Sequence, residues 1–107
     1  MKILFPLEES KGLESKIALH FGRAPWIGVW NTETQELKII PNPLLELHEK
    51  LERPVVKLIE LDFQVVFVKG IGRKAVEVLK EKGIKIKTGD FNTVREALEN
   101  KEKWVEI

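Results

Sequence analysis

The sequence predicts an α/β fold in which a mixed five-stranded sheet carries about three helices, in a single domain over residues 1–107. Three observations predict this fold. Two alternating runs, 26–32 and 36–40, are joined by a short polar stretch and indicate an antiparallel hairpin. An unbroken apolar run, 64–68, is typical of a strand buried on both faces of a parallel sheet. Strand-like and helix-like segments alternate around it, as in units that connect parallel strands.

The elements of the amino-terminal half follow from local patterns. The first strand is predicted over 2–7, KILFPL, an apolar run of β-type residues, and a polar loop follows over 8–16. In the hairpin, alternation divides the first strand into two faces: Trp26, Gly28 and Trp30 on one, Ile27 and Val29 on the other. Pro41-Asn-Pro43 ends the second hairpin strand.

The carboxyl-terminal half alternates between helices and strands. Pro54 suits a first helical position and favours a helix over about 53–61. Apolar residues at helical spacing predict a second helix that starts near Ile71 and is closed by Gly83. An alternating strand follows over 84–87. The last helix is predicted from a capping box, Thr93-Val-Arg-Glu96, and Trp104 is expected to dock the tail on the core.

Composition excludes several classes of function. The chain has no cysteine, so disulfides, thiolate metal sites and cysteine catalysis are impossible. A net charge of +1 gives no electrostatic argument for nucleic-acid binding, which normally needs a concentrated basic face. We expect no signal peptide and no membrane-spanning segment, and therefore a cytoplasmic protein. The dominance of Lys and Glu among the polar residues indicates a thermophilic source.

A histidine and an arginine stand close together before the hairpin, in SKIALHFGRAPW at 15–26. The imidazole of His20 suits a metal ligand or a proton carrier, and equally a surface or capping group. The guanidinium of Arg23 suits an anionic ligand because it binds negative atoms through a fork of donors. His48 is the other histidine of the chain, and the two imidazoles form a metal site if both face one cleft.

A glycine-rich turn, Gly70-Ile-Gly72-Arg-Lys-Ala75, follows the buried strand and opens a helix. It matches the G-x-G-x-x-A dinucleotide fingerprint, and Asp90 lies where such sites keep a ribose-binding acid. The same glycines suit a plain strand-to-helix turn, or a general anion contact at a helix N-terminus. Loops that follow parallel strands meet at one edge of a sheet, so we expect three loops to converge: 7–16, 69–72 and 87–92.

A mixed sheet of this order resembles the ribonuclease H type of architecture, in which clustered carboxylates on core strands hold two metal ions. The first predicted strand, KILFPL, contains no carboxylate. The sequence also has no G-x-S-x-G elbow and no P-loop. We therefore expect a ribonuclease H-like arrangement without nuclease activity.

These residues together resemble the dinitrogenase iron–molybdenum cofactor biosynthesis family, meaning NifX, NafY and the C-terminal domain of NifB. The resemblance covers almost the entire chain, and its most specific part is His20-Phe-Gly-Arg-Ala-Pro25 before an aromatic strand. The other stretches that carry it are Asn42-Pro43, Gly70-Ile-Gly72, Gly83-Ile-Lys85 and Thr93-Val-Arg-Glu-Ala-Leu98.

The resemblance implies a ribonuclease H-like fold and a carrier of iron–molybdenum cofactor, or of its iron–sulfur precursor, rather than a catalyst. It implies that His20 contacts the cluster and that Arg23 supports the cluster's negative charge. We expect cofactor contacts from His20, Phe21, Gly22, Arg23, Gly70, Gly72 and Asp90, with His20 and His48 as metal ligands. The expected partners are the cluster or another small anionic ligand, and cluster donor or acceptor proteins. The chain itself is expected to be a monomer or a homodimer.

Two other functions stay open on the sequence. A nucleotide or phosphorylated small molecule could bind at the Gly70–Ala75 turn. Alternatively, the chain could be a regulatory subunit without a ligand that uses Trp26 and Trp30 at a partner interface.

Overall fold

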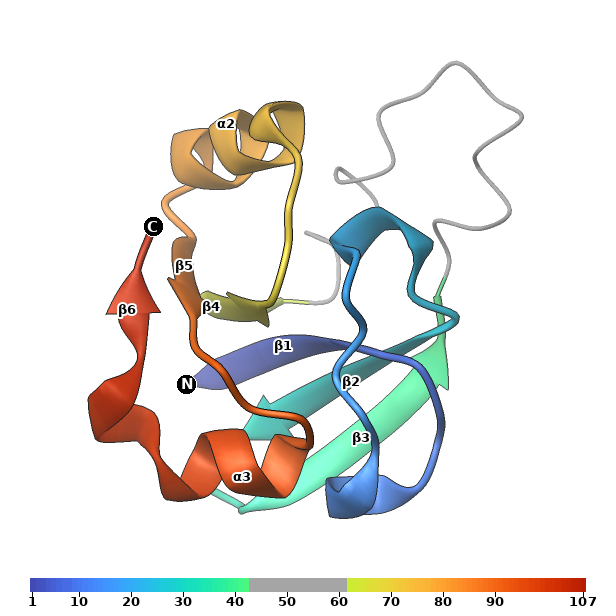
Figure 1. Ribbon diagram of the computed structural model, residues 1–107. Helices are drawn as coiled ribbons and strands as arrows, with labels where there is room; N and C mark the ends of the chain where they lie inside the picture. Colours follow the sequence, from blue (N-terminus) through green and yellow to red (C-terminus); the bar gives the residue numbers. More distant parts are fainter. Residues whose placement is uncertain (43–61) are drawn as a thin grey trace.

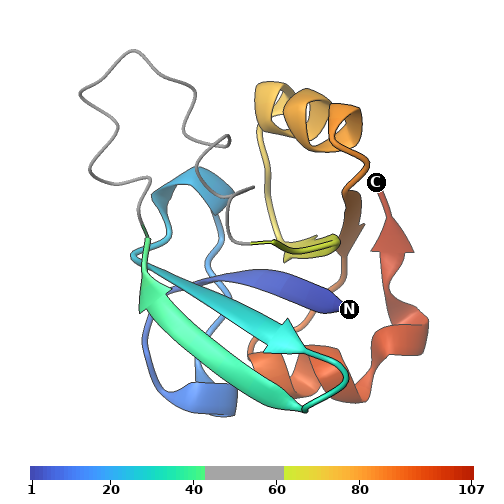
Figure 2. The same cartoon turned by 180° about the vertical axis from the view of Figure 1, so that it is seen from behind.

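In the part of the chain that the structure describes, one mixed sheet has a helix on each face, which gives a three-layered α/β arrangement (Figures 1 and 2). The computed structural model describes residues 1–42 and 62–107. The sheet order is β3-β2-β1-β4-β5-β6. Its strands are β1 (Lys2–Leu7), β2 (Trp26–Asn31), β3 (Glu36–Pro41), β4 (Val65–Val68), β5 (Lys85–Thr88) and β6 (Val105–Glu106). The described helices are α2 (Arg73–Glu81) and α3 (Val94–Glu99), with 3-10 turns η1 (Gly12–Glu14), η2 (Phe21–Arg23) and η4 (Lys101–Lys103).

Strand pairing confirms the predicted mixed sheet. Strands β1, β4 and β5 run parallel to one another, whereas β2 is antiparallel to both β1 and β3. The predicted hairpin is therefore β2–β3. Its turn is held by Asn31, whose Oδ1 accepts a hydrogen bond from the Glu33 amide at 2.9 Å. All five predicted strands are present, and their bounds differ from the prediction by no more than one residue.

Among the described residues the sheet has six strands and not the predicted five, because the tail forms an additional short strand. Strand β6 pairs antiparallel with the outer edge of β5. Trp104 brings it there: the indole packs against Phe5 and Phe67, and its Nε1–H donates to the Ala97 carbonyl at 2.9 Å. Docking of the tail through Trp104 is thus confirmed, and the strand that follows it depends on this tertiary contact.

Two of the three predicted helices are seen as α2 and α3, and the predicted helix at 53–61 lies outside the described residues. Helix α2 is closed by Gly83, which follows the C-cap Lys82 and takes a left-handed φ of +76° as a C′ residue does. At the start of α3, the Thr93 hydroxyl accepts from the Glu96 amide at 3.2 Å. The Glu96 carboxylate accepts from the amide of Asn92, one residue before the position predicted from the capping box.

The core has two halves, one on each face of the sheet. Because side chains alternate along each strand, Leu4 and Val66 face α2, whereas Phe5 and Phe67 face α3. The buried residues of the α2 half are Leu4, Phe21, Ile27, Phe63, Val66, Val68, Val78, Leu79, Ile84 and Ile86. Those of the α3 half are Ile3, Phe5, Leu7, Ile17, Val65, Phe67, Val94 and Ala97.

The two tryptophans of β2 pack into the α3 half and are half-buried there. Gly28 lies between them, and a Cβ atom at this position would come within 2.8 Å of Leu7 Cδ1. The predicted division of β2 into two faces is therefore confirmed, and intramolecular packing accounts for Trp26 and Trp30. Neither described helix has the length and apolar character needed to cross a membrane.

Candidate functional site

An open hollow of about 550 Å³ lies between η2 and the start of α2, and we call it the η2–α2 hollow. It is lined by His20, Phe21, Gly22, Arg23, Gly70, Ile71 and Gly72. Six of the seven residues predicted to contact a cofactor are thus gathered in one place, although the two segments are far apart in the sequence. Ile71 is the lining residue that the sequence prediction did not include.

Burial of Phe21 and Ala24, three positions apart, explains why the side chains of His20 and Arg23 point outward. Phe21 and Ala24 are buried, at 2% and 1% exposure, and Phe21 belongs to the α2 half of the core. His20 and Arg23 lie on the exposed side of the same turn. The turn is closed by a hydrogen bond from the Arg23 amide to the His20 carbonyl at 3.3 Å. The motif therefore works as two apolar anchors that hold an imidazole and a guanidinium at the surface.

A buried asparagine holds the end of this turn. The Asn42 Nδ2 group donates to the Ala24 carbonyl at 2.6 Å, and the Asn42 amide donates to the Pro25 carbonyl at 3.0 Å. Asn42 is only 3% exposed. The family resemblance included Asn42 without giving it a role. In the structure, its two hydrogen bonds hold the backbone carbonyls that directly follow η2.

Gly70 is required by a close backbone approach. Its carbonyl accepts a hydrogen bond from the Phe21 amide at 3.1 Å, which ties the end of β4 to η2. A Cβ atom at position 70 would lie 2.8 Å from the Leu19 carbonyl oxygen, a contact that real Cβ atoms do not make. The first glycine of the fingerprint is therefore explained by chain packing that joins the two sides of the hollow.

Gly72 opens helix α2 toward the same hollow. It is the N-cap residue, with extended backbone angles, and no side chain caps the helix. The first turn of α2 contains no acidic residue and begins with Arg73 and Lys74. Cations at a helix N-terminus oppose the helix dipole, so this end of α2 is a strongly positive region that favours an anion.

Two charged or titratable side chains of the hollow, His20 and Arg23, are exposed. Within residues 1–42 and 62–107, the His20 imidazole and the Arg23 guanidinium have no hydrogen-bond or ion-pair partner in the protein. No carboxylate from the described residues lines the hollow. An unpaired guanidinium, a helix N-terminus and an imidazole together suit a negatively charged ligand that contains a metal.

Two predicted site residues are not gathered here. Asp90 is exposed and does not line the η2–α2 hollow, because it follows β5, which lies on the far side of β4 from η2. Its role in cofactor binding stays a prediction. His48 lies outside the described residues, so the two-imidazole site also stays a prediction. Within the described part of the chain, no three imidazole or carboxylate side chains gather as a metal site.

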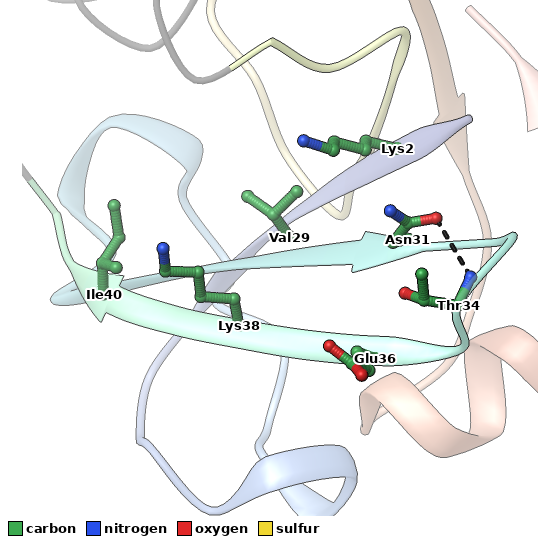
Figure 3. Close-up of a pocket in the computed structure, with 7 residues that line it drawn as sticks. All are labelled: Lys2, Val29, Asn31, Thr34, Glu36, Lys38 and Ile40. Atoms are coloured by element: carbon green, nitrogen blue, oxygen red, sulfur yellow. Dashed lines mark hydrogen bonds between the residues drawn. The ribbon is translucent and has the colours of Figure 1, made fainter.

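A further hollow lies over the hairpin, where side chains of three strands point to one side (Figure 3). It combines Lys2 and Lys38 with Glu36, so the charges on its wall are of mixed sign. Its apolar floor includes Val29 and Ile40, which pack against the α2 half of the core. No imidazole of the described residues reaches it, and it lacks the metal-binding chemistry of the η2–α2 hollow.

Comparison with known proteins gives a family and a fold. A family model described as dinitrogenase iron-molybdenum cofactor matches residues 1–103. The chain is similar to the apo orange protein from Desulfovibrio gigas, with a TM-score of 0.83 and 21% identity over 99% of this chain and 92% of that one. It is similar to a NifB-type protein of the DUF35 family from Thermotoga, with a TM-score of 0.81 and 23% identity over 98% and 91% of the two chains.

A dinitrogenase-type protein from Methanocaldococcus jannaschii is similar as well, with a TM-score of 0.70 and 16% identity over 100% of this chain and 94% of that one. Comparison with the curated proteins finds no match. At these identities the structural likenesses establish the fold, and the family rests on the match of residues 1–103.

Proposed function

Because the chain belongs to the dinitrogenase iron–molybdenum cofactor family, we propose that it is a non-catalytic carrier whose cargo is an anionic iron–sulfur or iron–molybdenum cluster. The cargo lies in the η2–α2 hollow. Proteins that donate or accept the cluster are its expected partners. The mixed sheet, with an antiparallel hairpin beside parallel strands, supports the ribonuclease H-like assignment of the fold.

The observation that carries this proposal is the pairing of His20 and Arg23 on one anchored turn beside an uncapped helix N-terminus. The imidazole offers a nitrogen ligand to a metal of the cluster. The guanidinium of Arg23 and the positive end of α2 stabilise the cluster's negative charge. Each of these groups has a different task, and all of them face one hollow.

The absence of cysteine fits a transient cargo. Iron–sulfur clusters that reside permanently in a protein are most often held by four thiolates, and this chain has none. An imidazole, a guanidinium and backbone amides hold an anionic cluster through one coordinate bond and several electrostatic contacts. Such a site releases its ligand more readily than a thiolate cage, as a carrier must.

Anaerobic titration with a cluster donor tests the proposal. His20→Ala is expected to weaken binding at least about tenfold, since it removes the coordinate bond, and Arg23→Gln to weaken it less and in a salt-dependent way. Lys101→Gln serves as the control, because Lys101 is an exposed cation in η4, away from the hollow. Equal binding by the wild type and His20→Ala, or binding by neither, would contradict the proposal.

A second candidate is a nucleotide or another phosphorylated small molecule bound at the Gly70–Ala75 turn. The uncapped N-terminus of α2 favours it, with Arg73 and Lys74 in the first turn. A thermal-shift screen separates the two candidates. Stabilisation by nucleotides but not by the cluster supports the second candidate, and stabilisation by the cluster alone supports the first.

A further inference from the structure

A separate hollow of about 340 Å³ lies at the carboxyl ends of the parallel strands, and we call it the strand-end hollow. It is lined by Glu8, Lys16, Ile17, Leu19, Lys69 and Asn92. Glu8 directly follows β1, Lys69 directly follows β4, and Asn92 lies in the loop after β5. The carboxyl edge of a parallel sheet is where α/β folds bind small ligands. This volume falls within the range of small-molecule sites.

Backbone hydrogen bonds join three of the segments that line this hollow, those of Glu8, of Lys16 with Ile17, and of Asn92. The Ile17 amide donates to the Asn92 carbonyl at 2.8 Å, and the Glu8 amide donates to the Lys16 carbonyl at 2.9 Å. An isolated β-bridge joins Lys16 to Thr93. Ile17 itself is buried in the α3 half of the core. The hollow is therefore preorganised, and a ligand would not need to order its walls.

The polar groups of the hollow suit an oxyanion. Lys69 is half-buried, and its Nζ lies 3.3 Å from Asn92 Oδ1, which holds the ammonium at the wall. The Lys16 ammonium forms no ion pair with the described residues, although its charge also acts on the Glu9 carboxylate, which accepts from the Lys16 amide at 3.2 Å. Two ammonium groups and an amide can donate to the oxygens of one phosphate or carboxylate. Glu8 is the one carboxylate among the lining residues and opposes an anion.

We propose that the strand-end hollow binds a compact oxyanion group, phosphate or carboxylate, through Lys16, Lys69 and Asn92. This site is distinct from the η2–α2 hollow, because the two sets of lining residues do not overlap. Leu19 lines the strand-end hollow and the next residue, His20, lines the other, so the two sites are neighbours. Binding at the strand-end hollow does not require His20.

Two-dimensional NMR titration of the full chain tests this proposal, with inorganic phosphate in one arm and succinate in the other. Saturable shifts are expected at the amides of Lys69 and Asn92. Lys69→Gln is expected to weaken binding about tenfold, since it removes a charged donor. Lys16→Gln weakens binding in the same direction, whereas Glu8→Gln strengthens it by removing a repulsive charge. Lys85→Gln, at an exposed strand position, is the matched control and leaves binding unchanged.

The arm that saturates at the lower concentration identifies the oxyanion class. Shifts centred on Gly22 and Gly72, or shifts that do not saturate in either arm, would overturn the proposal. Equal affinity of the wild type, Lys69→Gln and Lys16→Gln would overturn it as well. His20→Ala must leave phosphate and succinate binding intact, and loss of that binding would refute a separate site. If the chain binds an oxyanion here but no cluster, only the proposal for the η2–α2 hollow is contradicted.

Discussion

Replacement of Gly70 by alanine tests how the η2–α2 hollow is assembled. The new Cβ atom would lie 2.8 Å from the Leu19 carbonyl oxygen, and this atom belongs to the backbone, so no side-chain rotation relieves the clash. The hydrogen bond from the Phe21 amide to the Gly70 carbonyl, 3.1 Å long, is strained at the same time. Overpacking costs about 1–3 kcal/mol and loss of a backbone hydrogen bond about 1 kcal/mol. We expect Gly70→Ala to lower the free energy of unfolding by about 2–3 kcal/mol.

Gly72→Ala is the matched control for this substitution. A Cβ atom at position 72 meets no atom within 4 Å, and the backbone angles there suit any residue. Alanine is a poorer N-cap residue than glycine, but it lowers the conformational entropy of the unfolded chain. Because these effects oppose each other, we expect Gly72→Ala to change the free energy of unfolding by less than about 1 kcal/mol.

Urea unfolding at constant m measures the two free energies, and amide exchange at Phe21 reports the local bond. Equal stability of Gly70→Ala and Gly72→Ala, with unchanged protection of the Phe21 amide, would refute the assigned role of Gly70.

Two other predictions concern the support of η2 and the edge of the sheet. Asn42→Ala removes the Nδ2 group that donates to the Ala24 carbonyl at 2.6 Å, and it should lower the free energy of unfolding by about 1–3 kcal/mol. Urea unfolding measures this change, and an unchanged midpoint would contradict the prediction. The hydrogen bond and charge of Lys87 lower the pKa of the Glu106 carboxyl below its ordinary value of 4.5. The ion pair therefore stabilises β6 fully at pH values above 4.5, and this stabilisation is lost as the pH falls through the lowered pKa and the carboxylate is protonated. The Ile107 amide donates to the Ile86 carbonyl of β5 at 2.9 Å, next to the Lys87–Glu106 pair, so an NMR titration of this amide should show the transition in the wild type and lose it in Glu106→Gln.

Much of the fold can be predicted from the sequence because its strands carry clear alternation. The two faces of β2 follow from Trp26, Gly28 and Trp30 against Ile27 and Val29, and packing on both sides of the sheet confirms them. The sixth strand could not be predicted, because a two-residue strand has no periodicity. Its position depends on where Trp104 docks, a contact between residues far apart in the sequence.

The candidate site was predictable in its local parts and not in its assembly. The stretch around His20 combines two chemical groups with two apolar anchors, and each of these is visible in the sequence. The hydrogen bond between Phe21 and Gly70 cannot be seen in the sequence, because it joins backbone atoms of two distant segments. Asp90 illustrates the same limit. Its spacing from Gly70 matches a fingerprint, but β5 lies one strand farther from η2 than β4 does, so the loop after it borders the strand-end hollow through Asn92.

We propose that the His20 imidazole coordinates the cargo in the η2–α2 hollow, and the nitrogen ligand can be detected directly. Pulsed electron paramagnetic resonance of cluster-loaded protein, prepared anaerobically in a paramagnetic state, measures the coupling of the cluster to nearby nitrogen nuclei. We predict an imidazole nitrogen coupling in the wild type that is lost in His20→Ala and retained, at least in part, in His48→Ala. An identical nitrogen coupling in the wild type and in His20→Ala, with the cluster still bound, would contradict the claim.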